Sequence, residues 1–437
     1  MLKQKFEIDG IGRALINIVG NTGLGFNHMV KLTNPDTDEE SLAKVIRVSE
    51  DETTLQLLTG TFDLPTNATI TSLGESMTVS YSGDIGGRFF DGTGQPIDGR
   101  GPLAFAQKIS IESITLNPAV RLIPNQMMET GIPGIDVFNT LVKSQKVPFF
   151  AAPGEPYNKL LANIAANAKV DAIIIGGMGL KYDEYQYFRD ELSKSGNLDK
   201  TTMFVHLAGE PIGKGLLVPD TALSTAKMMM NEGKDVLVIL TDMTNWSNFL
   251  RDIANYQDNV PSLQGYPGDL YSQLATRYET AADMEGAGSI TILGATTLES
   301  VEDPVPDNTG YITEGQFFIV DGKLKLFGSL SRLKQNVNAD TRPDHRKVVD
   351  AVSQLMQQAE KAHEASLIGS GDDPFSIKLR QFRTDFINQL ENPFNSMSLF
   401  EGLDLCWELL AKYFDPIQVG VPTELLKDYW PNYQAEA

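Results

Sequence analysis

The amino-terminal 75 residues contain five short runs rich in β-branched and apolar residues, each bounded by Gly, Asn, Asp or Pro. No helical period separates these runs, and the pattern is typical of strands joined by turns. It predicts a small β-barrel over residues 1–75, with one sheet of a larger sandwich as the alternative. The runs are LINIVG (15–20), HMVKLT (28–33), AKVIRVSE (43–50), TTLQLLT (53–59) and TITSLG (69–74).

Between residues 76 and 333, continuous apolar runs alternate with amphipathic stretches. Strands that are apolar throughout and are followed by helices predict βαβ units, with a parallel sheet covered on both faces. Ligands bind such sheets at the carboxyl ends of the strands. The expected strand and helix pairs are VPFFAAP with NKLLANIAANA, DAIIIGGM with DEYQYFRDELSKSG, TMFVHLAG with DTALSTAKMMMNEG, and VLVILTDMT with WSNFLRDIANY.

Residues 334–437 keep the helical pattern but contain no strand pattern. Residues 346–366 carry an apolar stripe beside a polar face, and the segment IGSGDDP at 368–374 predicts a loop. Ser398 is followed three residues later by Glu401, which predicts a capping box at the start of a helix. The sequence therefore predicts a multidomain chain that consists of a β-barrel, an α/β domain (76–333) and a carboxyl-terminal helical bundle.

Composition narrows the possible functions. The chain has 36 Lys and Arg against 57 Asp and Glu, a formal net charge of −21, which argues against general nucleic-acid binding. The single cysteine, Cys406, excludes an internal disulfide. No apolar run approaches the ~20 residues that span a bilayer, and MLKQKFEIDG lacks the apolar core of a secretory signal. The four histidines show no metal-ligand spacing, so we expect no structural metal and a soluble, intracellular protein.

The turn after the strand VPFF is the most informative segment for chemistry. It reads AAPGEPYN at 151–158 and lies between a predicted strand and a predicted helix, as the P-loop G-x-x-x-x-G-K-[ST] does. Gly154 remains inside the loop, but Pro156 stands at the second glycine. Tyr157 replaces the lysine, and Asn158 replaces the hydroxyl that binds Mg²⁺. An ordinary connection between a strand and a helix is the competing interpretation.

These replacements remove the groups that phosphate chemistry needs. A P-loop cradles phosphate with successive backbone N–H groups, and Pro153 and Pro156 have none. Lys159 lies two positions after Tyr157, roughly 200° around a helix, so it should point away. Asp242 follows an apolar strand in the manner of a Walker B aspartate, or simply as a helix cap.

Several longer segments resemble the B subunit of V-type and A-type rotary ATPases, and they occur in the expected order. The resemblance covers about residues 80–435 and is weaker in the amino-terminal strands. Its segments are GRFFDGTGQPIDG (87–99), ETGIPGIDVFNTLVKSQKVPFF (129–150), LVILTDMTNW (237–246), GYPGDLYSQLATRYETA (265–281), PDNTGYITEGQ (306–316), SLSRL (329–333), TRPDHRK (341–347), LDLCWELL (403–410) and LLKDYWP (425–431).

The resemblance implies a β-barrel, a RecA-like P-loop NTPase fold and a helical domain, in a ring where three A and three B subunits alternate. It also implies that the catalytic site belongs mainly to the A subunit, to which Arg332 of SLSRL supplies an arginine finger. ATP or ADP with Mg would bind at the A/B interface, with no cofactor held tightly by this chain. Central and peripheral stalk subunits are the further implied partners, and the complex would sit peripherally on the cytoplasmic face of a membrane. For Arg332 alone, a surface or interface salt bridge is the alternative.

Three features depart from the family or lack its chemistry. The family usually has an Arg pair before GYPG, where this chain has Leu263 and Gln264, and Trp246 replaces a tyrosine. Leu180 stands where related ATPases place the carboxylate that activates water. Two other hypotheses remain, a self-sufficient RecA-like hexameric motor ATPase and a free-standing nucleotide sensor. The sequence leaves H⁺ against Na⁺ transport open, as well as net synthesis against hydrolysis.

Overall fold

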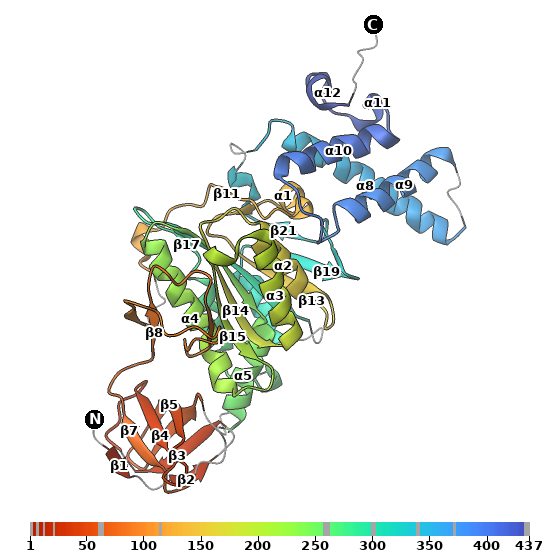
Figure 1. Cartoon of the computed structure of the whole chain (residues 1–437). Helices are drawn as coiled ribbons and strands as arrows, with labels where there is room; N and C mark the ends of the chain where they lie inside the picture. Colours follow the sequence, from red (N-terminus) through yellow and green to blue (C-terminus); the bar gives the residue numbers. More distant parts are fainter. Residues whose placement is uncertain are drawn as a thin grey trace.

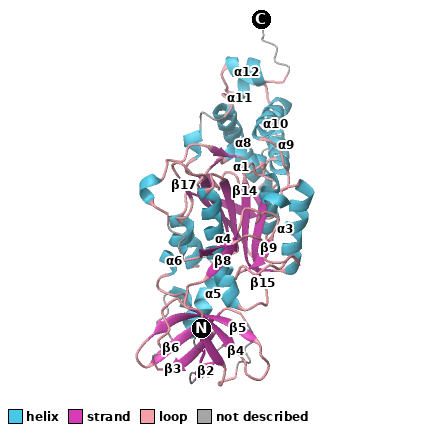
Figure 2. Ribbon diagram, turned by 60° about the vertical axis from the view of Figure 1, so that its left-hand side comes forward, coloured by secondary structure: helices cyan, strands magenta, loops and turns pink. Residues whose placement is uncertain are grey.

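The chain is elongated, with an antiparallel sheet at one end, a parallel sheet in the middle and helices at the other end (Figure 1). Figure 2 shows the same succession from another side, with the helices of the middle part packed along the sheet. The computed structural model describes residues 3–5, 8–11, 14–20, 22–59, 65–112, 116–256, 263–298, 303–337, 341–369 and 373–431.

The amino-terminal sheet has seven antiparallel strands in the order β1-β7-β4-β5-β6-β3-β2. Its two edges are formed by β1 and β2, which are only two residues apart along the chain, so the sheet curls to bring its two edge strands near one another. The curled sheet encloses one apolar cluster and confirms the predicted barrel over the sandwich. Its strands are β1 (Lys3–Lys5), β2 (Ile8–Ile11), β3 (Leu15–Val19), β4 (Met29–Thr33), β5 (Glu40–Val48), β6 (Glu52–Leu57) and β7 (Thr69–Ser72).

The central sheet follows the order β20-β19-β13-β18-β16-β14-β15-β9, and its seven longer strands are all parallel. This confirms the parallel sheet that the continuous apolar runs predict. The parallel strands are β9 (Phe89–Asp91), β13 (Lys146–Ala151), β14 (Ala172–Leu180), β15 (Thr201–Leu207), β16 (Asp235–Thr241), β18 (Ser289–Thr297) and β19 (Gly315–Val320). Short antiparallel additions are β17 (Ala282–Asp283), β20 (Lys323–Leu324) and β21 (Leu330–Ser331). Outside this sheet, two short pairs join β8 (Thr78–Tyr81) with β10 (Gln107–Ser110) and β11 (Met127–Met128) with β12 (Leu141–Val142).

Alternate side chains of these strands enter two different cores, because successive residues of a strand point to opposite faces. Ile173 and Ile175 pack in one core with helices α2 (Tyr157–Asn167) and α3 (Tyr182–Ser195). Ile174 packs in the other, with α4 (Ile212–Asn231), α5 (Met243–Tyr256), α6 (Leu270–Tyr278) and α7 (Pro304–Ile312).

Helix α4 begins earlier than the sequence pattern predicts. Its predicted start was near Asp220, but the helix begins at Ile212 and contains Pro219 in its interior. Proline normally ends or kinks a helix because it has no N–H and its ring clashes with the preceding turn. Here the first two turns are buried against neighbouring elements, so packing extends the helix beyond its local signal.

The carboxyl-terminal part is a set of packed helices, as predicted. Helices α8 and α9 pack side by side and α10 lies against both, while α10 also contacts α1 (Pro133–Phe138) of the central part. The capping box of Ser398 and Glu401 is present. No helix in the ranges described above combines the length and the apolar character needed to cross a bilayer. The helices are α8 (His345–Leu367), α9 (Pro374–Gln389), α10 (Leu399–Tyr413), α11 (Pro416–Val419) and α12 (Thr423–Tyr429).

Candidate functional site

The P-loop-like turn lies at the carboxyl end of β13 and leads into α2. Gly154 has a φ of +91°, a conformation that favours glycine. The Glu155 N–H donates to the Ala152 carbonyl at 3.1 Å, and the Tyr157 N–H donates to the Glu155 carbonyl at 2.9 Å. These donors are therefore used within the turn rather than directed into an anion cradle.

The turn also contains a carboxylate, that of Glu155. The Glu155 carboxylate accepts hydrogen bonds from the backbone N–H groups of Asp321 and Gly322 at 2.9 and 2.8 Å. Both donors belong to the turn between β19 and β20. A protein carboxylate therefore takes backbone donors beside the turn, and its charge opposes a phosphate group there.

Tyr157 points at Asp242, the Walker B-like residue that follows β16. The Tyr157 hydroxyl donates to Asp242 Oδ2 at 3.3 Å. The same carboxylate accepts from Thr297 Oγ1 at 2.8 Å and from the Thr244 N–H at 2.7 Å. Burial raises the pKa of Asp242 to about 6, although these hydrogen bonds oppose the shift, and burial also raises the pKa of Tyr157. A neutral phenol is therefore bound to the carboxylate that a Walker B site would direct at a magnesium water.

Asn158 is buried in a second set of hydrogen bonds. It accepts from Thr241 Oγ1 at 2.5 Å and donates to Glu184 Oε1 at 2.9 Å. Glu184 also accepts from the Lys181 N–H at 3.0 Å, so it caps α3 as well as holding the turn. Lys159 points away from the turn, with its ammonium 5.6 Å from the ring centroid of Tyr187.

The residues at the turn do not fit a nucleotide phosphate with its magnesium ion. The lysine and the Ser/Thr hydroxyl are replaced, Pro153 and Pro156 offer no N–H, and Asp242 is occupied by three protein donors. Leu180 is buried in the apolar core, so no carboxylate takes the water-activating position there. Within the described ranges, no group of three His, Cys, Asp or Glu side chains is placed to hold a metal ion.

Arg332 and the turn lie at opposite ends of the parallel strands, Arg332 at the end where β13 begins and the turn at the end where β13 stops. It directly follows β21, which pairs with the first residues of β19. Its backbone N–H donates to the Glu314 carbonyl at 3.0 Å, and the Glu314 N–H donates to the Lys146 carbonyl at 2.9 Å. Lys146 begins β13, whereas the turn follows its end, and six residues of strand span about 20 Å.

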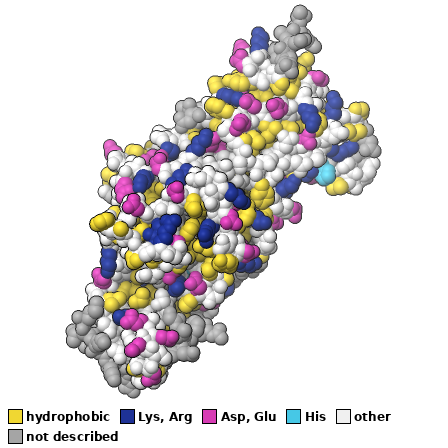
Figure 3. Space-filling view, viewed as in Figure 1, with side chains coloured by type: hydrophobic (Ala, Val, Ile, Leu, Met, Phe, Trp, Pro, Cys, Tyr) yellow, Lys and Arg dark blue, Asp and Glu magenta, His cyan; other side chains and the backbone are white. Residues whose placement is uncertain are grey.

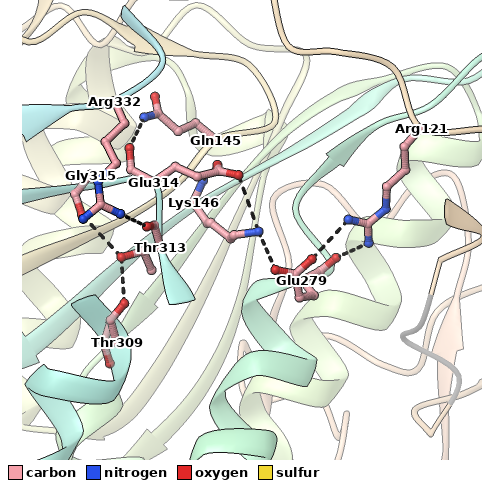
Figure 4. Close-up of polar contacts among 9 residues, drawn as sticks. All are labelled: Arg121, Gln145, Lys146, Glu279, Thr309, Thr313, Glu314, Gly315 and Arg332. Carbon is pink, nitrogen blue, oxygen red and sulfur yellow. Dashed lines mark hydrogen bonds and ion pairs between the residues drawn. The ribbon is translucent and has the colours of Figure 1, made fainter. Parts of the chain in front are cut away.

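The Arg332 guanidinium is exposed and makes no ion pair with any residue the structure describes (Figure 4). Its Nη1 donates to the Thr313 carbonyl at 2.6 Å. The neighbouring charges pair with one another instead, because Lys146 Nζ lies 2.6 Å from Glu279 and 3.5 Å from Glu314. Burial alone would raise the pKa of Glu279, but Lys146 and Arg121 lower it below its ordinary value. The positive charge of Arg332 is therefore left available at this edge.

The departures from the family pattern have structural partners. Trp246 is fully buried and donates its indole N–H to the Leu216 carbonyl at 3.2 Å. The Arg277 guanidinium lies 4.2 Å from the Trp246 ring centroid. Leu263 and Gln264 begin a short 3₁₀ turn, in which Gln264 has a φ of +56°. His206 is buried and accepts the Gly179 N–H at 3.1 Å, as expected of a packed strand-end residue.

Some participants could not be found from the sequence. Thr297 reaches Asp242 from the end of β18, 55 residues further along the chain, and no spacing links the two. The Thr244 N–H bond, two residues after Asp242, is the helix-cap contact that the sequence offered as the alternative for this aspartate. The bond between Glu184 and Asn158 likewise has no sequence signal, because the two residues are 26 positions apart.

The parallel sheet, with a turn and an acidic residue at its carboxyl edge, places the chain in a class of nucleotide-binding domains. The family model described as "ATP synthase alpha/beta family, nucleotide-binding domain" matches residues 131–325. A second model, "C-terminal domain of V and A type ATP synthase", matches residues 334–430. The class is therefore the ATP synthase alpha/beta nucleotide-binding domain with a V/A-type carboxyl-terminal domain.

Comparison with curated relatives identifies the family within this class. The chain is 48% identical over 397 residues to the V-type ATP synthase beta chain of Borrelia turicatae (strain 91E135), covering 90% of this chain and 92% of that one. It is 47% identical over 433 residues to the Treponema denticola protein of the same name, covering 99% and 100%. The corresponding Protochlamydia amoebophila protein is 46% identical over 393 residues, covering 89% and 90%. The chain belongs to the V-type ATP synthase beta chain family, and is thus a subunit of a multisubunit rotary ATPase.

Proposed function

We propose that this chain is a non-catalytic, regulatory subunit that alternates with an A subunit in a ring of three plus three. Arg332 is its arginine finger, directed at nucleotide bound to the neighbouring A subunit. The observation that carries this proposal is the separation of Arg332 from the chain's own P-loop-like turn. The two lie at opposite ends of β13, about 20 Å apart, so Arg332 cannot contact a ligand bound at that turn.

The electrostatics of Arg332 support the same role. An arginine supplied in trans stabilises charge that develops on a transferring phosphoryl group, and is worth about 10³ to 10⁵ in rate. Such a group must be free of a competing carboxylate, and Arg332 bonds only to a carbonyl among the described residues. Its planar fork matches phosphoryl oxygens.

The surroundings of Arg332 fit a protein partner. Leu330 and Tyr311 are 40% and 82% exposed beside the Arg332 segment, and Leu122 and Ile123 are 46% and 81% exposed beside Arg121. Exposed apolar groups rimmed by charges mark protein interfaces. Figure 3 shows that apolar patches also lie among charges of both signs on the face it presents.

The chain's own turn supports the non-catalytic part of the proposal. Tyr157 stands in place of the P-loop lysine and has no ammonium, and Asn158 stands in place of the Ser or Thr and has no hydroxyl for Mg²⁺. Both side chains are bound to protein groups instead. The same features argue against a self-sufficient hexameric motor. An exposed arginine aimed away from the chain's own turn argues against a free-standing sensor.

The remaining parts of the proposal rest on the resemblance to the family. ATP or ADP with Mg would bind at the A/B interface, and the stalk subunits would contact the ring. The complex would sit on the cytoplasmic face of a membrane and transport H⁺ or Na⁺. We further propose a division into domains at residues 1–75, 76–333 and 334–437, each dominated by one of the three kinds of structure described above.

The test is the substitution Arg332→Ala in the assembled complex. We expect MgATP turnover to fall by about 10³-fold or more, with a much smaller change in nucleotide affinity. Arg332→Lys should rescue poorly, because an ammonium lacks the planar fork. Arg100→Ala, at an exposed position near the far edge strand β9, is the matched control and should keep turnover. Normal assembly with near-unchanged turnover of Arg332→Ala would show that Arg332 is an ordinary interface residue.

A further inference from the structure

The side-chain amide of Gln145, the residue before β13, forms hydrogen bonds with the segment that carries Arg332. Gln145 is fully buried. Its Nε2 donates to the Glu314 carbonyl at 2.7 Å and to Ser331 Oγ at 3.1 Å, while its Oε1 accepts from the Val142 N–H at 3.1 Å. One amide therefore joins Glu314, which precedes β19, to strand β21 and to the end of β12. Figure 4 draws its bond to the Glu314 carbonyl.

The Glu314 carbonyl is the junction between Gln145 and Arg332. It accepts both the Gln145 amide and the Arg332 backbone N–H, the latter at 3.0 Å. The preceding carbonyl, that of Thr313, accepts the Arg332 guanidinium at 2.6 Å. The peptide segment of Thr313 and Glu314 thus holds Arg332 at its backbone and at its side chain, and Gln145 holds that segment.

Strand β21 needs this side-chain support because it is very short. It consists of Leu330 and Ser331 alone, and two residues of pairing restrain a strand weakly. Ser331 is buried and donates its hydroxyl to the Thr140 carbonyl at 2.8 Å while accepting from Gln145. The hydrogen bonds of Gln145 and Ser331 therefore add to this short ladder in holding the segment from which Arg332 leaves the sheet.

We infer that Gln145 is a positioning residue for Arg332, a role that rests on the proposed function of Arg332. Gln145 is buried behind the edge and contacts the arginine only through the Glu314 carbonyl and Ser331. A misplacement of about 1 Å at a reacting centre can cost about 10²-fold in rate. Loss of the amide lets β21 shift against β19, so the guanidinium no longer meets the developing charge.

The experiment uses the chain assembled with its A subunit and MgATP as substrate. Gln145→Met keeps the side-chain length and removes its hydrogen-bonding atoms. We expect kcat to fall by about tenfold to hundredfold while KM changes by less than about twofold. Ser331→Ala should lower kcat in the same direction, and it carries the test if Gln145→Met does not assemble.

The matched control is Ser329→Ala, in the same Ser-Leu-Ser-Arg motif. Its hydroxyl donates to the Lys325 carbonyl at 2.7 Å and accepts the Phe318 N–H at 3.1 Å, and makes no contact with Gln145 or Arg332. Ser329→Ala is expected to lower the unfolding temperature but to keep kcat. An equal loss of kcat in this control would overturn the positioning role.

A double-mutant cycle separates an effect of Gln145 that acts through Arg332 from a structural effect that is independent of Arg332. With Arg332→Ala already present there is no guanidinium to place, so Gln145→Met should change the residual kcat by less than about twofold. A full additional loss would show a structural effect and overturn the inference. If Arg332→Ala lowers kcat but Gln145→Met does not, only the positioning role fails. If Arg332→Ala leaves kcat unchanged, the proposed function fails and the positioning role fails with it.

Discussion

The hydroxyl of Tyr157 donates a hydrogen bond to the carboxylate of Asp242 across the carboxyl edge of the sheet, at 3.3 Å. The two residues stand where a P-loop lysine and a Walker B aspartate would stand. In a catalytic site that pair faces phosphate and magnesium, whereas here the phenol binds the carboxylate directly. The contact is a hydrogen bond within the protein, and it uses the carboxylate that a magnesium water would need.

The isolated chain is therefore expected to show no MgATP turnover above background. Tyr157→Lys alone should not create activity, because Pro156 removes an N–H from the cradle and Leu180 supplies no carboxylate. Phosphate release measured on the purified chain and on the variant checks both statements. Robust hydrolysis that Asp242→Ala abolishes would contradict them and favour the self-sufficient motor.

The burial of Asp242 predicts a pH dependence of stability. Its pKa is raised to about 6 in the folded chain, so the folded state holds a proton that the unfolded state has already lost. The free energy of unfolding therefore contains a contribution that decreases as pH rises through about 6. Asp242→Asn removes this titration, so the unfolding free energy of the unchanged chain minus that of the variant should fall by about 1 kcal/mol from pH 5 to pH 7. Urea unfolding at several pH values measures the difference, and a constant or rising value would contradict the prediction.

Arg277 is expected to contribute to the stability of the fold. Its Nη2 lies 2.7 Å from Asp220 Oδ2, and its guanidinium covers the Trp246 ring. Arg277→Ala leaves the Asp220 carboxylate without its cation, which should cost about 3–5 kcal/mol of unfolding free energy. Arg346→Ala, on the exposed face of α8, should change stability by less than about 0.5 kcal/mol. Denaturant unfolding of both variants checks this, and near-equal stability would refute the buried-pair interpretation.

Assembly is the fourth prediction. Arg332 and the turn lie at opposite ends of the parallel strands. Each chain can therefore present Arg332 to one neighbour in a ring and the turn to the other. Mixing with an A subunit should give particles near three plus three copies, as measured by native mass spectrometry or light scattering. MgATP should tighten the mixed ring, since the proposed nucleotide site lies between subunits. A stable homohexamer of this chain alone would speak for the motor hypothesis.

Local signals predicted much of the fold because their information is contained in neighbouring residues. The five amino-terminal runs became β3 to β7, and the capping box at Ser398 lies where its spacing placed it. The start of α4 was wrong because burial of its first turns outweighs the local effect of Pro219. The length and period of a hydrophobic pattern predict whether a segment is a helix or a strand. The residues at which that element begins and ends depend on the parts of the fold that pack against it.

The site was only partly predictable for a related reason. The replacements at Tyr157 and Asn158 are visible in the sequence as missing chemistry, but their new partners are not. Asp242 and Glu184 come from other strands and helices, so the hydrogen bonds to them exist only after the sheet has formed. Gln145 gives no sequence signal at all, because a lone polar residue before a strand is ordinarily exposed.

Residue patterns along the chain were enough to predict the three kinds of structure, the replaced P-loop positions at residues 151–158 and the place of Arg332 in a Ser-Leu-Ser-Arg segment. The folded chain was needed to show that Tyr157 binds Asp242 and that Gln145 bonds to the segment carrying Arg332. It was also needed to show that Arg332 lies near the start of β13 and the turn at its end. The physical reason is that parallel strands distant in the sequence must align before their ends meet. Which side chains meet across a sheet depends on strand order, and strands that are neighbours here are far apart in the sequence, so no short segment contains that information.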